Sequence, residues 1–427
     1  MIGPKKISEL TKEEKKKLLE GRKIKIFEVM DYVRDIIEGV KARGDRALKE
    51  YTLRFDGIRI ESIQVDEDLF EKAYDVVSID VIRALETLAD NIREHHYPQL
   101  PKSYISFIRG SILTGILWRP FRRVGIYVPG GKATYPSTLL MAAIPARIAG
   151  VREVYVTTPP RPQGTFPVDP VILIAANIAK VDAVFTIGGA QAIAALAFGT
   201  ETVPKVDKII GPGNIYVNAA KALVSQDVAI DMIAGPSEIL IIADDSATPL
   251  AVALDLIAQG EHDPNSTCIL VSLDEKLAKA VKCELDGYAR GTAKKSIENN
   301  GAILLADSLE EAIEFSNEFA PEHLELCIRD PWSALRLIEN AGSVSLGEWT
   351  PVALSDYMTG CNHILPTAGL SKIKSVLSIY DFLRAIPIQM ALKEKELKEL
   401  FTMASIIAEA EGLRFHAQSL RRRIQCL

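Results

Sequence analysis

The chain has 427 residues, of which 48% are hydrophobic and 25% are charged, and its formal net charge is −6 at pH 7. This length and composition predict a globular protein of two or more domains and exclude a largely disordered chain. A mildly acidic chain does not attract nucleic acid or an anionic membrane surface as a whole, so neither is expected as a partner.

The N-terminal segment gives no indication of export or membrane insertion. It reads "MIGPKKISELTKEEKKKLLEGRK", which is charged and has no apolar centre. The run that comes closest to a membrane span, "TLLMAAIPARIAG", is interrupted by Pro145 and Arg147. The five cysteines stand singly, without a CxxC pair, which favours reduced thiols. We therefore expect a soluble, cytoplasmic protein.

Residues 1 to about 115 carry mainly the helical spacing of apolar residues. The segment "KIFEVMDYVRDIIEGVKARG" predicts a helix that stops at Gly44. The segment "DLFEKAYDVVSIDVIRALETLADNIREHH" predicts one or two further helices. The first 25 residues are expected to form a helical extension.

From Val124 onward, short β-branched segments alternate with helical ones. The strands "VGIYV", "EVYVTT", "DAVFTI" and "DKII" form one series, and "EILIIA", "TCILVS" and "AILLA" form a second series after a break at residues 234–238. Helices are predicted between them, in the second series over residues 248–259, 274–288 and 308–319. Such alternation implies parallel sheets with right-handed crossovers. We predict an α/β protein with two Rossmann-like parallel-sheet units and helical N- and C-terminal extensions.

The predicted domain boundaries follow from these changes of pattern. We assign four parts to the chain: an N-terminal helical extension, a first α/β domain in two segments, a second α/β domain, and a polar helical tail, covering residues 1–25, 26–126 plus 236–379, 127–235, and 380–427.

Three glycine-rich loops follow successive strands of the first series, in "YVPGG", "TIGGAQAI" and "IIGPGNIYVN". Glycine allows the backbone to approach a ligand closely, and the N-terminus of the following helix favours anions. The loops are therefore compatible with a nucleotide or phosphate cleft. None is a GxGxxG motif, because Tyr216 stands where the third glycine would be, so ordinary βα turns remain an equal alternative.

The second series carries the acid and imidazole groups. Gln259 and His262 stand three residues apart at the end of a predicted helix, and Glu322 and His323 directly follow a proline. Further candidates lie in the loop "TPVALSDYMTGCNHILPT" and in the tail segment "AEAEGLRFHA": Asp356, His363, Glu411 and His416. Imidazole, carboxylate and amide oxygen suit zinc, and an adjacent Glu–His pair suits proton transfer. Spacing alone leaves open whether these residues form a metal site or are ordinary caps, turns and surface groups.

The chain resembles the histidinol dehydrogenase family over nearly its whole length, from "RGDRALKEYTLRFDG" to "AEAEGLRFHA". The most specific segments are "RVGIYVPGGKATYPSTLLM", "GGAQAIAALAFGTETVPKVDKIIGPGNIYV", "IDMIAGPSEILIIAD", "QGEHDP", "APEHLE" and "SDYMTGCNHILPT". The resemblance implies a zinc- and NAD-dependent enzyme of histidine biosynthesis. Such an enzyme oxidises L-histidinol to L-histidine through a bound L-histidinaldehyde, in two hydride transfers to two NAD.

The same resemblance implies the roles of individual residues. One zinc ion per subunit would be bound by Gln259, His262, Asp356 and His416, and Glu322 and His323 would be the acid/base groups. NAD would contact Tyr127, Gln191 and Asn214. The substrate would contact Ser237, Gln259, His262, His323, Asp356, Glu411 and His416. The first α/β domain would then carry most of the zinc and acid/base residues, and the second the NAD cleft. The resemblance also implies a homodimer in which the C-terminal tail, with Glu411 and His416, reaches the partner's active site.

The chain departs from the family pattern at several positions beside these residues. Ser355 and Ala368 stand where glycine is usual, and Cys361 stands where proline is usual. These substitutions flank the implied ligands without replacing any of them. Cys361 is a less favoured ligand or nucleophile, because Asp356 and His363 already account for the resemblance of its loop.

Three other functions stay open from the residues. A related zinc- and NAD-dependent dehydrogenase that acts on a sulfonated diol would need a cation where Glu411 stands. A zinc hydrolase with Glu322 as base would leave the three glycine-rich loops without a role. A non-catalytic metal- or metabolite-binding protein is not excluded by any motif.

Overall fold

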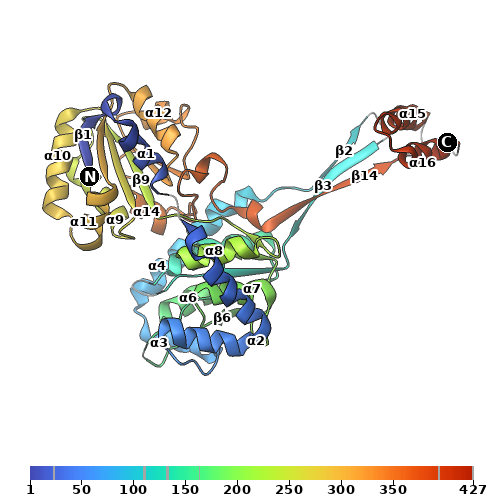
Figure 1. Ribbon diagram of the computed structural model, residues 1–427, viewed down its shortest axis with the longest axis horizontal. Coiled ribbons are helices and arrows are strands. Elements are labelled where there is room, and N and C mark those ends of the chain that lie inside the picture. The colour runs from blue at the N-terminus through green and yellow to red at the C-terminus, as the bar shows by residue number, and fades with distance from the viewer. Residues whose placement is uncertain (23–24, 109–111, 131–133, 163, 393–394, 426–427) are drawn as a thin grey trace. The chain divides into compact units, whose positions relative to one another are not determined.

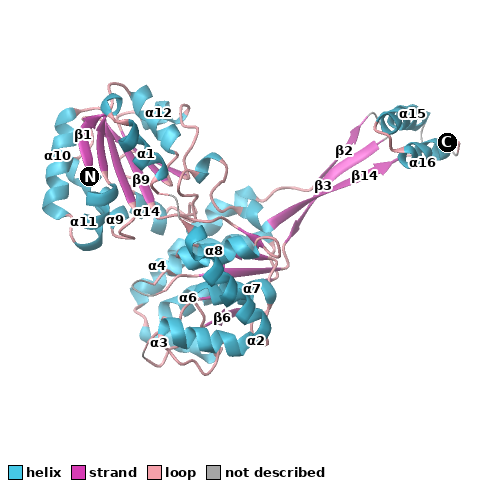
Figure 2. Ribbon diagram, viewed as in Figure 1, coloured by secondary structure: helices cyan, strands magenta, loops and turns pink. Residues whose placement is uncertain are grey.

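The computed structural model describes residues 1–22, 25–108, 112–130, 134–162, 164–392 and 395–425, and the chain divides into two compact units. Unit 1 comprises residues 1–99 and 121–382, and unit 2 comprises residues 100–120 and 383–427. Figures 1 and 2 show that unit 1 contains two sheets, each flanked by helices, and that unit 2 contains a long antiparallel ribbon of strands. None of the helices in these ranges combines the length and apolarity needed to cross a membrane.

Unit 1 contains a five-stranded sheet with the order β6-β5-β4-β7-β8, in which every pairing is parallel. The chain extends the sheet from β4 first on one side and then on the other, so the strand order reverses between β4 and β7. In open α/β sheets, ligands bind beyond the carboxyl ends of the strands at such a point. The strands and their connecting helices are β4 (Arg123–Tyr127), α5 (Pro136–Ala149), β5 (Glu153–Thr157), α6 (Pro170–Ile178), β6 (Ala183–Phe185), α7 (Gly189–Phe198), β7 (Lys208–Ile210), α8 (Ile215–Val224) and β8 (Ala229–Ile230).

The helices α2 (Met30–Asp56), α3 (Asp68–Val76) and α4 (Ile79–His96) pack onto this sheet's own helices. Helix α2 packs on α7 and α8, α3 on α6, and α4 on α5. The domain boundaries predicted from the sequence group residues 26–126 with residues 236–379, whereas these three helices contact helices of the five-stranded sheet. Helical spacing identifies an apolar face but not the sheet that this face covers, which explains the difference. At Gly44, where the sequence predicts the end of a helix, φ is +51° and ψ is −134°, so the helical conformation is interrupted there and two helical segments meet at a kink within α2.

The second sheet of unit 1 has six parallel strands in the order β1-β11-β10-β9-β12-β13. Its apolar core lies on two faces, one covered by α9, α10 and α11 and the other by α1 and α12, as Figure 1 shows. The elements are β1 (Ile2–Lys6), α1 (Lys12–Glu20), β9 (Glu238–Ala243), α9 (Pro249–Gly260), β10 (Thr267–Ser272), α10 (Glu275–Tyr288), α11 (Gly291–Asn300), β11 (Ala302–Leu305), α12 (Leu309–Phe319), β12 (His323–Cys327), α13 (Pro331–Leu335), β13 (Ser343–Leu346) and α14 (Val352–Tyr357). Short 3-10 turns cover Ile7–Glu9, Ile26–Val29, Tyr97–Gln99, Leu370–Lys372 and Ile379–Phe382.

The sequence predicts a helical N-terminal segment, and this prediction is wrong for its first residues. There β1 pairs with β11 at the edge of the six-stranded sheet. Among residues 1–22, the one regular α-helix is α1, and its N-terminus is closed by a capping box between Thr11 and Glu14. The polar sequence "IGPKK" gives no strand signal, since its backbone pairing with β11 decides its conformation.

Unit 2 contains a three-stranded antiparallel sheet and a pair of helices that contact each other. The sheet has the order β14-β3-β2, with β2 (Tyr104–Ile108), β3 (Ile112–Pro120) and β14 (Leu383–Ala391). The helices are α15 (Lys395–Ala410) and α16 (Arg414–Ile424). The helical tail is confirmed for α15 and α16, but the helical prediction is wrong for the three strands. Their pairing joins segments distant in sequence, which local periodicity does not reveal.

Candidate functional site

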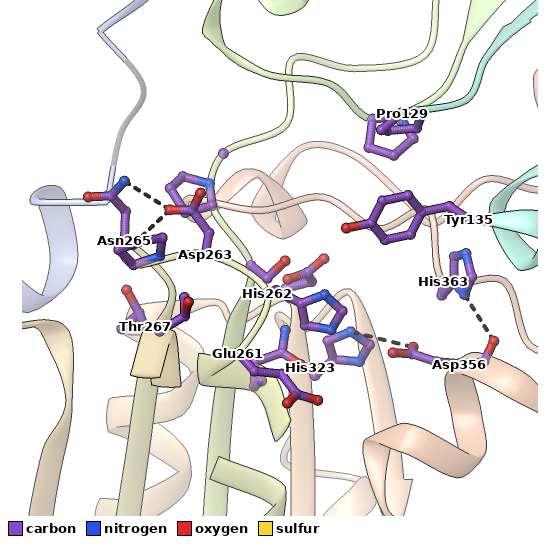
Figure 3. A pocket seen from close by; sticks show the side chains of 18 of the residues that line it. Pro129, Tyr135, Glu261, His262, Asp263, Asn265, Thr267, His323, Asp356 and His363 are labelled. Atoms are coloured by element: carbon purple, nitrogen blue, oxygen red, sulfur yellow. Dashed lines mark hydrogen bonds and ion pairs between the residues drawn. The ribbon is translucent and has the colours of Figure 1, made fainter. Parts of the chain in front are cut away.

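Both sheets of unit 1 contribute to one cleft of about 1770 Å³. The five-stranded sheet contributes loops from the carboxyl ends of its strands, including Pro129 after β4 and Asn214 after β7. The six-stranded sheet contributes the opposite, amino ends of its strands, with Ser237 before β9 and His323 at the start of β12. Figure 3 shows His262, His323 and Asp356 near one another, with Pro129 and Tyr135 across the cleft.

The C-terminus of α9 positions two predicted ligands. Gln259 lies in the last turn of the helix and is buried, and its Nε2 donates to the carbonyl oxygen of Glu238 at 3.5 Å. His262 follows the helix and its side chain is exposed within the cleft. Desolvation by the surrounding protein nevertheless lowers the pKa of His262, so its imidazole is neutral and able to bind a metal at neutral pH.

Glu322 and His323 enter the cleft where β12 begins, and both are buried. Glu322 Oε2 accepts a hydrogen bond from the backbone nitrogen of Glu238 at 2.7 Å. Desolvation raises the pKa of Glu322 well above its ordinary value, and this hydrogen bond offsets only part of the rise. Desolvation also lowers the pKa of His323 to about 3, with the imidazoles of His363 and His262 acting in the same direction. His323 is therefore unprotonated throughout the neutral pH range, which leaves a ring nitrogen free to act as an acceptor.

Asp356, on α14, carries the polar atom of the cleft that most clearly lacks a partner. Its Oδ1 is buried, lies 3.9 Å from His323 Nε2, and has no hydrogen-bond partner among the described residues. Desolvation raises the pKa of Asp356 to about 7. A buried carboxylate without a partner is costly, so a bound cation would compensate for this burial.

His363, unlike Asp356, has hydrogen-bonding partners at both ring nitrogens, so neither nitrogen is free to bind a metal. Its Nδ1 donates to the backbone oxygen of Asp356 at 3.0 Å, and its Nε2 lies 3.2 Å from Thr138 Oγ1. The ring therefore connects α14, which carries Asp356, to α5. Within the described ranges, no three His, Cys, Asp or Glu side chains lie close enough together to hold a metal ion.

The three residues assigned to NAD lie together at a second cavity of about 940 Å³, beside the reversal of strand order. Tyr127 ends β4, and its hydroxyl accepts from the backbone nitrogen of Gly189 at 3.2 Å. Gln191 is buried, and its Oε1 has no hydrogen-bond partner in the described part of the chain. Asn214 caps α8, because its Oδ1 accepts from the backbone nitrogens of Tyr216 and Val217. Gly131, in the loop after β4, lies outside the described residues.

Of the eight residues predicted for zinc binding, substrate binding and acid/base chemistry, six line the larger cleft of unit 1, namely Ser237, Gln259, His262, Glu322, His323 and Asp356. The other two belong to unit 2. Glu411 follows α15, His416 lies on α16, and both side chains are exposed. Unit 1 therefore contains three of the four predicted zinc ligands, and the fourth belongs to unit 2.

Sequence reasoning missed a buried ion pair, Arg22 with Glu238, that lies next to Glu322. Arg22 and Glu238 are buried, and Arg22 Nη1 donates to Glu238 Oε2 at 2.6 Å. The backbone nitrogen of Glu238 in turn holds Glu322. The signal was a single carboxylate at the start of the otherwise apolar strand "EILIIA", since a buried charge of this kind needs a partner.

The departures from the family pattern have local structural roles. Ala368 has φ of +55°, a region that favours glycine, and its backbone nitrogen donates to Glu238 Oε1 at 2.8 Å. Ser355 is buried, with its Oγ 3.4 Å from Ser345 Oγ. Cys361 Sγ lies 3.8 Å from His95 Nδ1.

Comparison with known proteins bears on the whole chain. The sequence model of the family described as histidinol dehydrogenase matches residues 20–424. The histidinol dehydrogenase of Methanocaldococcus jannaschii is 46% identical over 426 residues, which cover 99% of this chain and 98% of that relative. The histidinol dehydrogenase of Methanopyrus kandleri is 47% identical over 422 residues, covering 96% and 97%.

A solved structure agrees with these sequence relationships. The crystal structure of histidinol dehydrogenase from Elizabethkingia anophelis superposes with a TM-score of 0.92 at 36% identity, covering 98% of this chain and 97% of that one. Sequence and fold match along nearly the full length of both chains. The chain therefore belongs to the histidinol dehydrogenase family.

Proposed function

We propose that the chain oxidises L-histidinol to L-histidine through bound L-histidinaldehyde, with zinc and two NAD, in histidine biosynthesis. Family membership over nearly the whole chain supports the reaction. The observation that carries the proposal is the cleft that joins the loops after β4 and β7 to Glu322, His323 and Asp356. This arrangement would allow the nicotinamide to lie beside the acid/base groups.

The residues of the cleft fit a zinc ion. Gln259, His262 and Asp356 would hold it with the amide oxygen, imidazole nitrogen and carboxylate oxygen that zinc accepts. The unpartnered Oδ1 of Asp356 is the strongest single indication of a cation. When bound, zinc would supply a point of attachment for the imidazole and amino nitrogens of the substrate, which is positioning more than activation.

The acid/base steps follow from the two buried residues of β12. His323, whose imidazole is unprotonated, would take the hydroxyl proton of L-histidinol, and bound NAD would supply the hydride acceptor. Glu322, whose raised pKa makes its carboxylate a stronger base than usual, then takes a proton from water that attacks the aldehyde. Its hydrogen bond from the nitrogen of Glu238 occupies one oxygen and leaves the other for that water.

NAD would lie between Tyr127, Gln191 and Asn214. The unpartnered Oε1 of buried Gln191 can accept a hydrogen bond from the dinucleotide, and the N-terminus of α8 behind Asn214 favours its phosphates. Ser237 and Glu411 would contact the substrate, Glu411 through the substrate's ammonium group.

We further propose a homodimer in which the unit 2 of each chain completes the cleft of its partner with Glu411 and His416. Unit 2 exposes large apolar side chains on its helices, including Ile406, Ile407 and Phe415, whose exposed fractions are 59%, 61% and 84%. Apolar patches of this kind mark protein–protein contacts. The exposed His416 would then be the fourth zinc ligand, supplied by the partner.

The reaction is tested by counting products. Purified protein with L-histidinol and NAD should form two NADH for each L-histidine, and a zinc chelator should stop the reaction until Zn²⁺ is restored. Release of the aldehyde after one NADH, or full activity in excess chelator, would contradict the proposed function.

A further inference from the structure

A buried ion pair lies against the first residue of the loop between β7 and α8. Lys221, on α8, and Asp231, which follows β8, contact each other, and each side chain is 1% exposed. Lys221 Nζ donates to the backbone oxygen of Gly211 at 3.0 Å. The backbone nitrogen of Gly211 donates to Asp231 Oδ2 at 2.8 Å. The pair thus holds both polar backbone groups of a single residue.

A second buried side chain of α8 holds the same loop further along. Asn218 stands three residues before Lys221, so the two share one face of the helix. Its Nδ2 donates to the backbone oxygen of Gly213 at 2.8 Å and to that of Ala234 at 3.0 Å. Its Oδ1 accepts from the backbone nitrogen of Ala234 at 3.0 Å. The loop of residues 211–214 is therefore fixed by side chains of the helix that it leads into.

The backbone geometry explains why the loop needs such fixing. Gly211 has φ of +121°, and a Cβ at this position would lie 2.0 Å from the backbone oxygen of Tyr127. The loop consequently passes directly against the end of β4, at the reversal of strand order. Asn214 lines both cavities from this position, while among their described lining residues neither Lys221 nor Asp231 is present.

Burying both charges of an ion pair costs desolvation free energy that their attraction often only partly offsets. Two desolvated charges are often no better for stability than two apolar side chains of similar volume. What an apolar pair cannot do is fix the orientation of the Gly211 backbone by donating to its oxygen and accepting from its nitrogen.

We propose that Lys221 and Asp231 are positioning residues that hold the Gly211–Asn214 loop in the conformation that binds the dinucleotide. This inference rests on the proposed NAD site and adds two residues that touch neither ligand. Loss of the pair should weaken the binding of NAD, since the loop would sample other orientations. The zinc and substrate groups on the six-stranded sheet should be unaffected.

The test is a double variant, Lys221→Met with Asp231→Asn, which removes both charges together and leaves no unpaired buried charge. The KM for NAD and the dissociation constant of NAD should each rise on the order of 10-fold, because charge-assisted hydrogen bonds to the loop are lost. The KM for L-histidinol and the zinc content should stay within about twofold, a difference too small to reflect a lost contact. A purely structural role would lower the melting temperature without this selective effect on NAD.

A matched control lies at the other end of β7. Lys208, also buried, donates to the backbone oxygen of Asp381 at 2.7 Å and lies 3.2 Å from its Oδ1. Lys208→Met removes a comparably buried lysine from the start of β7, away from the Gly211–Asn214 loop at its end. This variant should leave the KM for NAD unchanged.

A second double variant, Lys221→Gln with Asp231→Asn, is used in case the first does not fold, because it also leaves no unpaired buried charge and its asparagine can still accept from Gly211. It should raise the dissociation constant of NAD several-fold. NAD binding by a folded variant equal to that of the wild type, or an equal rise in the KM of both substrates, would overturn the positioning role. Failure of the wild-type protein to bind NAD at all would overturn the proposed NAD site itself.

Discussion

Asp356→Ala is expected to abolish bound zinc and catalytic activity together. The unpartnered, buried Oδ1 of Asp356 is the group in the cleft that most requires a cation, and alanine removes it. In the proposed mechanism the substrate would then lose the attachment that orients its reacting carbon, so the rate should fall on the order of 10³-fold or more. The measurement is zinc per subunit, determined by elemental analysis, alongside NADH formation from L-histidinol.

The variant should lose zinc without unfolding. Alanine removes a carboxylate whose burial is unfavourable, while the backbone oxygen of residue 356 can still accept from His363. The melting temperature of Asp356→Ala should therefore match that of chelator-treated wild type. Asp245→Ala is the control, because Asp245 lies beyond the opposite, carboxyl end of β9, in an exposed ion pair with Arg329. Full zinc occupancy in Asp356→Ala would refute its assignment as a ligand.

Glu322→Gln is expected to separate the two oxidations. Glutamine preserves the size of the side chain, and its oxygen can still accept from the nitrogen of Glu238. It cannot take a proton from water, so oxidation of L-histidinaldehyde should slow by about 10² to 10⁴-fold, the usual contribution of a general base. Oxidation of L-histidinol, for which His323 is the proposed base, should be slowed much less.

The two half-reactions are measured separately, by single-turnover NADH formation from L-histidinol and from L-histidinaldehyde. Glu261→Gln is the matched control, because Glu261 lines the same cleft but is exposed. It should leave both rates nearly unchanged. If Glu322→Gln slowed both half-reactions equally, Glu322 would not be the group that activates water.

Local sequence pattern predicted the parallel sheets well for a physical reason. Strands buried on both faces, such as β9 and β10, are continuous apolar runs, and the helices between them carry one apolar face. The strands β1, β3 and β14 lack this signature. Their backbones pair with partners far away in the sequence, and no local periodicity records such a pairing.

The candidate site was predictable only in part from its residues. Spacing brought Gln259 close to His262, and Glu322 next to His323, but it did not indicate that both pairs face one cleft. The resemblance to the family supplied that expectation, and unit 1 brings both pairs and Asp356 to the cleft. Buried supports such as Arg22 and Lys221 escaped notice, because each acts through a partner chosen by the fold.

The assembly of four ligands from two chains is tested most directly by mixing two inactive variants. His262→Ala damages the cleft but keeps an intact tail, and His416→Ala does the reverse. Each variant alone should be inactive. After the subunits of an equal mixture are exchanged, half of the dimers are mixed and each has one complete site, so about one quarter of wild-type activity and zinc should return. A mixture that stayed inactive after verified exchange, or an active His416→Ala homodimer, would contradict a zinc site completed by the partner subunit.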